Sequence, residues 1–139
     1  MSTRCNVIIK DGYENQLIFY RHSDGYPEGV APTLGEFLDL VKQGNIRDNV
    51  SQAAGWLILL GYEEYQKSNS LKGMRAKEDL YSWKVGAYEP APQISPDIDY
   101  LYEIDLEAKT LRGWNHNGYR KLGEITSEME MLERSRTDA

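Results

Sequence analysis

The sequence is poor in several residue types that would assign it to a familiar class. Among its 139 residues it has one cysteine, Cys5, two histidines and two phenylalanines. A single cysteine excludes an intrachain disulfide and a zinc site built from several thiolates, and it suits a reducing compartment. The longest apolar run, Trp56 to Leu60, is much shorter than a membrane span, and the first residues, MSTRCN, contain no apolar signal region. We therefore expect a cytoplasmic protein without a cofactor or a membrane segment.

Basic residues are also in the minority. The chain has 16 Lys and Arg against 22 Asp and Glu, which gives a formal net charge of -6. Phosphate backbones are bound by clustered Lys and Arg, so this balance argues against direct binding of a nucleic acid. It favours instead a protein or protein complex with a basic surface as the partner.

What the sequence does have is the composition of an ordinary globular domain. Hydrophobic residues make up 40% and charged residues 27%, which argues against wholesale disorder. We expect a single domain over residues 1–139, with a frayed tail at 133–139. The ten tyrosines and three tryptophans stand out. Such rings suit half-buried sheet faces and recognition surfaces equally well, so their number does not decide between the two.

The apolar pattern along the chain predicts an α+β fold. Alternation of apolar and polar residues indicates strands, and apolar residues one helical turn apart indicate helices. Thr33 and Glu36 form a capping box that would start the first helix, and segments 23–32 and 86–97, rich in Gly and Pro, are expected to be loops. The order strand-strand-helix-helix-strand-strand-strand, followed by a C-terminal helix, suggests a mostly antiparallel sheet of about five strands with helices on one face. The expected elements are strands at 4–10, 16–22, 80–85, 100–106 and 110–114, and helices at 33–44, 48–60 and from 121 onward.

The segment YRHSDGYPEG, at the end of the second predicted strand, concentrates reactive side chains. A histidine titrates near neutral pH, and a neighbouring carboxylate can orient it for acid-base work. The same residues fit a binding surface, or a structured turn in which Arg21 pairs with Asp24 or Glu28. All three interpretations stay open. The polar side chains of this segment are Arg21, His22, Asp24, Tyr26 and Glu28.

The other histidine, His116, lies in the segment GWNHNGY, also just after a predicted strand. If the two strand ends met, His22, Asp24 and His116 would form an acid-base or a metal-binding group. The spacing matches no metal motif, and neither histidine belongs to the His-x-Thr/Ser pattern of two-histidine phosphoesterases. We therefore predict no metal site. The catalytic candidates are His22, Asp24 and His116.

The stretch from Tyr88 to Ala108 contains six acidic residues and no Lys or Arg. An acidic, tyrosine-rich surface can attract a basic partner and steer its association. The alternative is a solvated edge strand that uses charge to prevent aggregation. Together with the YRHSDGYPEG segment, this stretch supplies the candidate binding residues. They are Arg21, His22, Asp24, Tyr26, Glu28, Asp97, Asp99 and Glu103.

Three segments, MSTRCNVII, FYRHSDGYPEGV and NVSQAAGWLILLGYEEY, resemble an uncharacterised family of small proteins from phages, prophages and bacterial mobile elements. Members begin Met-Ser/Gly-Thr-Arg and carry a Tyr/His-x-Asp-Gly-Tyr-Pro motif after the second strand. The resemblance covers about the first half of the chain. It implies an accessory or host-interaction role in the host cell cytoplasm, and it carries no activity over.

The sequence thus leads to two hypotheses. The first is a non-catalytic binding protein of phage or mobile-element type, such as a counter-defence or host-interaction factor, that meets a host protein or complex through an acidic, tyrosine-rich surface. The alternative is a small hydrolase or nucleotide-processing enzyme that uses His22 and Asp24. The sequence does not decide whether the chain is an enzyme, and it does not define the oligomeric state.

Overall fold

The computed structural model describes residues 3–71, 87–115, 120–125 and 131. Within them the chain forms two helices and six strands. In chain order these are β1 (Cys5–Lys10), β2 (Gln16–Arg21), α1 (Pro27–Lys42), α2 (Val50–Leu71), β3 (Glu89–Ala91), β4 (Tyr100–Asp105), β5 (Thr110–Asn115) and β6 (Arg120–Ile125).

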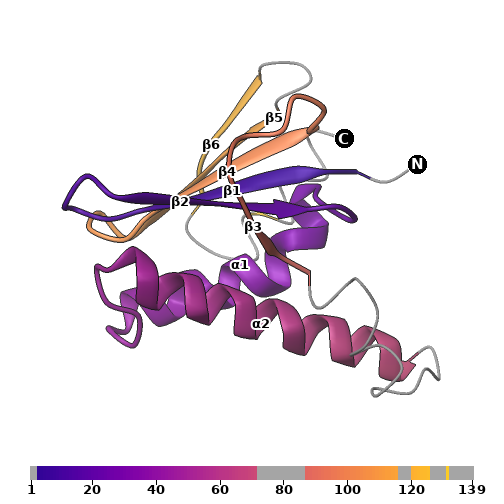
Figure 1. Cartoon of the computed structure of the whole chain (residues 1–139), viewed down its shortest axis with the longest axis horizontal. Helices are drawn as coiled ribbons and strands as arrows, with labels where there is room; N and C mark the ends of the chain where they lie inside the picture. Colours follow the sequence, from indigo (N-terminus) through magenta and orange to yellow (C-terminus); the bar gives the residue numbers. More distant parts are fainter. Residues whose placement is uncertain (1–2, 72–86, 116–119, 126–130, 132–139) are drawn as a thin grey trace.

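The strands form one mixed sheet in the order β3-β2-β1-β4-β5-β6. β1 runs parallel to β4, and the other neighbouring pairs are antiparallel. Both helices lie against one face of the sheet (Figure 1). The α+β class is thus confirmed. The prediction of about five mostly antiparallel strands is corrected in its details, because the described sheet has six strands and a parallel pair at its centre.

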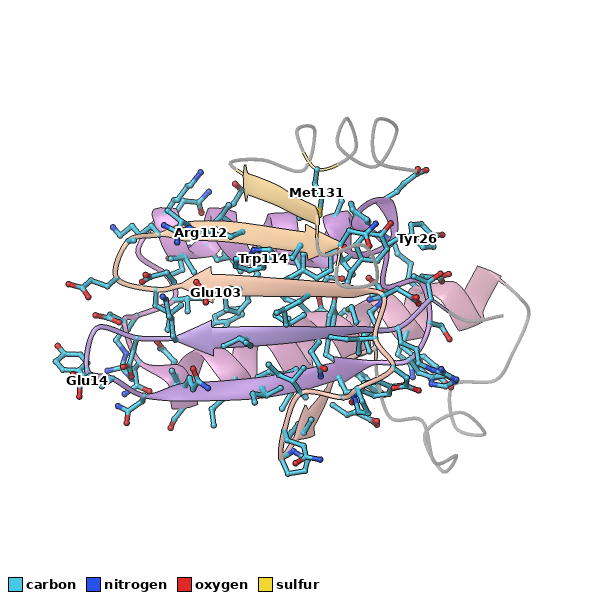
Figure 2. The ribbon with its side chains drawn as sticks, turned by 90° about the horizontal axis from the view of Figure 1, so that it is seen from above. Glu14, Tyr26, Glu103, Arg112, Trp114 and Met131 are labelled. Carbon is cyan, nitrogen blue, oxygen red and sulfur yellow. The ribbon has the colours of Figure 1, made fainter. Side chains whose placement is uncertain are left out.

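The parallel pair arises because the chain returns to β1 by a long path. After the helices and β3, residues 92–99 cross the face of the sheet that the helices leave open and reach β4 (Figure 2). The amide of Ser95 donates to Oδ1 of Asn6 at 2.8 Å, and the amide of Asp99 donates to the carbonyl of Arg4 at 2.9 Å. A local pattern predicts a strand but not its distant neighbour, so this pairing was outside the reach of the sequence.

Side-chain alternation divides the sheet into an inner face, toward the helices, and an outer face. Cys5, Val7 and Ile9 of β1 point inward and are fully buried, as are Tyr102 and Ile104 of β4. Full burial of a large apolar side chain stabilises the fold by roughly 1.5–3 kcal/mol. The helices contribute a matching set to this core. Its members are Val30, Ala31, Leu34, Phe37, Leu38, Val41, Ala53, Leu57 and Leu60.

Helix α1 starts at Pro27, so the loop predicted at 23–32 is confined to residues 23–26, and the predicted helix start at Thr33 is wrong. Pro27 occupies the first helical position, where its missing N–H costs nothing and its fixed φ suits a helix. The amides of Gly29 and Val30 both donate to the carbonyl of Tyr26. Val30 is fully buried, so core packing stabilises a first turn whose Gly and Pro content suggested a loop.

Helix α2 continues to Leu71, beyond the predicted end at residue 60, and Gly61 lies within it. A Cβ atom at Gly61 would lie 2.9 Å from Cδ2 of Tyr88, so the absence of a side chain lets Tyr88 pack directly on the helix. The amide of Ala87 donates to the carbonyl of Gly61 at 3.4 Å. Gly61 is therefore a docking position in the helix. Neither described helix has the length and apolar character of a membrane span.

The start of the predicted C-terminal helix is also corrected, whereas residues 126–130 and the tail predicted at 133–139 lie outside the described residues. Residues 120–125 form strand β6, which pairs with β5, where helical spacing predicted a helix from residue 121. Pairing with a neighbouring strand outweighs a short helical pattern. Strand β3 carries Pro90 at the edge of the sheet, a position that tolerates a missing N–H. The strand predicted at 80–85 lies outside the described residues.

Candidate functional site

Strand β2 ends by sending consecutive side chains to opposite faces of the sheet. Arg21 follows Phe19 onto the inner face, and both are buried. Tyr20 and His22 are partly exposed, and the Tyr20 hydroxyl lies 2.8 Å from Nδ1 of His22. Which of the two donates depends on the histidine tautomer. The YRHSDGYPEG segment therefore contributes Arg21 to the buried interior, and Tyr20 and His22 to the partly exposed face.

The turn at 22–29, which we define as the connection after β2 together with the first three residues of α1, has a backbone held from several sides. The amide of Gly25 donates to the carbonyl of Thr3 at 2.9 Å, and the Tyr102 hydroxyl donates to the carbonyl of Gly25 at 2.9 Å. Asp24 adopts a left-handed conformation with φ of 57°, which Asp tolerates better than most residues. A Cβ atom at Gly29 would lie 2.1 Å from the carbonyl oxygen of Asp24, so this close approach requires glycine.

Beside this turn lies the strand-end surface, which we define as Tyr20, His22, Asp24, Tyr26 and Asp97. Asp24 and Tyr26 are exposed, and the Asp97 side chain is 61% exposed. Figure 2 shows Tyr26 at the end of the sheet opposite the hairpin that carries Glu14. The surface combines carboxylates, phenols and an imidazole on a fixed backbone. Tyrosine is enriched in interfaces because it adds contact area and one polar atom.

The electrostatics of this surface are negative. Asp24, followed by partial burial and Glu28, raises the pKa of the Tyr26 hydroxyl. Partial burial raises the pKa of Tyr20, and Asp97 adds to this effect. An opposite charge placed by a partner would therefore be favoured over an additional negative charge. Arg4 offsets part of the field, since its Nη1 lies 3.0 Å from Oδ2 of Asp97.

Beneath the turn lies the buried cluster, which we define as Arg21, Thr33, Glu64 and Tyr88. Nη1 of Arg21 lies 2.8 Å from Oε2 of Glu64 as an ion pair, although its geometry is not that of a good hydrogen bond. The Arg21 guanidinium stands over the Tyr88 ring at 5.0 Å, and the Thr33 hydroxyl donates to Oε1 of Glu64. Burial raises the pKa of Tyr88, and it raises the pKa of the nearby Cys5 thiol to about 12.

The acidic stretch is divided between the two ends of β4. At one end, Asp97 pairs with the Arg4 side chain, and Oδ2 of Asp99 accepts from the Arg4 amide at 3.2 Å. Toward the other end, Nζ of Lys10 lies 3.2 Å from Oε1 of Glu103 and also contacts Asp105. The parallel pairing of β1 with β4 thus places a cation beside each half of the stretch. The half at Asp97 adjoins the YRHSDGYPEG segment, and so does Glu89 of β3, which pairs with Tyr20.

The structure separates several residues that the sequence grouped together. Arg21 pairs with Glu64, so its predicted pairing with Asp24 or Glu28 is corrected. His22 is partly exposed, and Asp24 and Tyr26 are exposed before α1. Glu28 is exposed in the first turn of α1. His116 falls outside the described residues, so its meeting with His22 stays a prediction. Among the described residues, no group of three or more potential ligands could hold a metal ion.

Four members of these sites were not among the predicted site residues, and neither was Arg4, the partner of Asp97. The four are Tyr20, Thr33, Glu64 and Tyr88. A signal for the buried cluster was present, because alternation in β2 places Arg21 on the same face as Phe19. An arginine on a core face needs a buried acidic partner. No local signal pointed to Glu64, since it reaches Arg21 only through the packing of α2 on the sheet.

No known protein family, no curated protein and no solved structure matches this chain.

Proposed function

We propose that this chain is a non-catalytic binding protein of phage or mobile-element type, which engages a host protein or protein complex with a basic surface. The strand-end surface would make the contact. The observation that carries the proposal is the fixed backbone of the turn at 22–29, which presents Asp24 and Tyr26 outward while its carbonyl and amide groups are bonded inward. A preordered surface loses little conformational entropy on binding, which favours affinity.

The chemistry of the partner follows from the side chains that are displayed. Carboxylates form charge-assisted hydrogen bonds with Arg and Lys, and tyrosine rings attract cations over their faces. Asp24 and Tyr26 provide one group of each kind. The chain's net charge of -6 would add attraction over longer distances at low salt.

A titration with charged peptides tests this proposal. Fluorescent oligoarginine, oligolysine and oligoglutamate of equal length are added at about 0.01 M and about 0.15 M salt, and anisotropy is followed. Asp24→Asn should weaken oligoarginine binding about threefold or more. Asn also tolerates the left-handed backbone of this position. Asp39→Asn removes one charge from an exposed position on α1 and serves as the matched control. Equal affinity of the two variants would contradict the proposal.

A second candidate is the small hydrolase or nucleotide-processing enzyme. The observation that favours it is the short contact between Tyr20 and Nδ1 of His22, because an oriented imidazole is a feature of acid-base sites. Purified protein is incubated with a panel of nucleotides and nitrophenyl esters. Turnover that disappears in His22→Ala and Asp24→Asn, while both variants stay folded, would favour the enzyme. Turnover that persists in both variants would eliminate these residues as catalysts.

A further inference from the structure

Arg21 holds the two sides of the turn at 22–29 from beneath. Its Nε donates to the carbonyl of Ser23 at 2.8 Å, and its Nη2 donates to the carbonyl of Gly29 at 3.2 Å. The guanidinium is planar and rigid, so two bonds from one group fix the distance between the two carbonyls. Arg21 therefore acts as a brace across the turn.

The same guanidinium is held in place by helix α2. Its third nitrogen, Nη1, pairs with Glu64 at 2.8 Å. The side chain of Arg21 is only 6% exposed, whereas that of Glu64 is 27% exposed. Glu64 also accepts a bond from Thr33 of α1. One carboxylate thus connects the brace to both helices, and it is the member of the ion pair that solvent can reach.

The ion pair makes the position of Arg21 depend on Glu64. A buried cation without a counter-charge is costly, and a long side chain avoids that cost by turning toward water. Such a movement would release the carbonyls of Ser23 and Gly29 together. Among the described residues, the turn keeps the bonds of Gly25 with Thr3 and Tyr102 and the contact of His22 with Tyr20.

We propose that the Arg21–Glu64 ion pair is a latch that couples helix α2 to the turn at 22–29. With the latch closed, the turn keeps the conformation that displays Asp24 and Tyr26. Loss of the Glu64 charge opens the turn while the sheet stays intact. The role of the turn in binding rests on the proposed function, but the latch itself does not.

Amide hydrogen exchange of the intact chain tests the latch without any partner. Glu64→Gln is compared with Glu63→Gln, which removes the same charge from an exposed neighbour on α2. The reporting amides are those of Gly25 and Gly29, and the amides of Val7 and Ile9 in the central strand report global opening. We expect Glu64→Gln to accelerate exchange at Gly25 and Gly29 about tenfold relative to Val7 and Ile9, and Glu63→Gln to leave that ratio unchanged.

The latch is overturned if the ratio is the same in both variants, or if turn and strand amides accelerate by the same factor. Arg21→Lys provides a second test, because lysine keeps the charge but lacks the fork that reaches two carbonyls. Its turn amides should also exchange faster than wild type, and wild-type exchange in this variant would contradict the brace. Oligoarginine binding is measured on the same samples. A looser turn with unchanged peptide affinity would confirm the latch and contradict the proposed binding surface.

Discussion

The inner and outer sides of the end of β2 perform different tasks with neighbouring residues. Arg21 enters the interior, where it contacts Glu64 and Tyr88 and braces the turn. Tyr20 and His22 contact one another at the outer surface, close to Asp97. Strand alternation alone produces this separation. One short motif thus combines a buried support with exposed side chains, so substitutions on the two sides should have different effects on stability and binding.

Arg21→Met should cause the largest loss of stability. It leaves Glu64 without its partner and removes the bonds to the carbonyls of Ser23 and Gly29. Breaking a buried ion pair typically costs about 3–5 kcal/mol, and the partial exposure of Glu64 reduces the expectation to about 2–4 kcal/mol. Urea unfolding of Arg21→Met and of the wild type measures this loss of unfolding free energy. His22→Ala, on the outer side, should cost about 0.5 kcal/mol or less, and equal losses in the two variants would contradict the division between the faces.

Two glycines of α2 differ in the same way, because one lies against the core and the other faces open space. A Cβ atom at Gly61 would press on Tyr88, whereas nothing lies within 4 Å of one at Gly55. Gly61→Ala should destabilise the protein by about 1–3 kcal/mol through overpacking. Gly55→Ala should stabilise it by about 0.5–1 kcal/mol, because alanine favours a helix. Thermal unfolding of both variants checks the opposite signs, and a stabilising Gly61→Ala would show that Tyr88 does not dock there.

The buried side chains of Cys5 and Tyr88 should lower the free energy of unfolding at alkaline pH. Burial raises the pKa of Cys5 from 9.0 to about 12, and it also raises the pKa of Tyr88. Each group stabilises the fold fully below its unfolded pKa and loses that contribution as the pH rises toward its folded pKa. For Cys5 the loss runs from about pH 9 to about pH 12, at about 1.4 kcal/mol per pH unit.

The check is the slope of unfolding free energy against pH above 9 in the wild type and in Cys5→Ala. The alanine variant should show the shallower slope, whatever its overall stability. Parallel slopes would contradict the burial of the thiol. In the folded wild type at neutral pH, Cys5 should also react with iodoacetamide no faster than global unfolding allows.

The smallest change in stability is expected on loss of the exposed ion pair between Arg4 and Asp97. Arg4 and Asp97 are exposed by 36% and 61% at their side chains, and exposed pairs contribute about 0–1 kcal/mol. Asp97→Asn should therefore change stability by about 0.5 kcal/mol or less at about 0.15 M salt. A loss as large as that of Arg21→Met would show that residues 92–99 support the core.

Much of the fold was within reach of the sequence, since alternation predicts β1, β2, β4 and β5 within one or two residues of their bounds. The start of α1 could not be predicted, because Pro27 and Gly29 suggest a loop until the burial of Val30 is known. The parallel pairing of β1 with β4 could not be predicted either, because it depends on a contact between segments that are distant in the sequence. Long-range pairing leaves no local periodicity.

The candidate site shows the same limit. The sequence located the YRHSDGYPEG segment, and strand alternation put Arg21 on the same face as Phe19, but the partners predicted for Arg21 were wrong. Asp24 and Glu28 are near in sequence, whereas Glu64 becomes near only when α2 packs on the sheet. Likewise, the acidic stretch looks continuous in sequence. Two cations, Arg4 just before β1 and Lys10 at its end, pair with different parts of this stretch in space.

One variant, Tyr26→Ala, tests directly whether the strand-end surface binds cations, because stability and binding are both measured on it. Its backbone, which accepts the first amides of α1, is unchanged by the substitution. Oligoarginine anisotropy and urea unfolding are measured on the same preparation. We predict an affinity about tenfold weaker than wild type, with a loss of unfolding free energy of about 1 kcal/mol or less. Wild-type affinity in a folded Tyr26→Ala protein would contradict the assignment of the strand-end surface as the binding site.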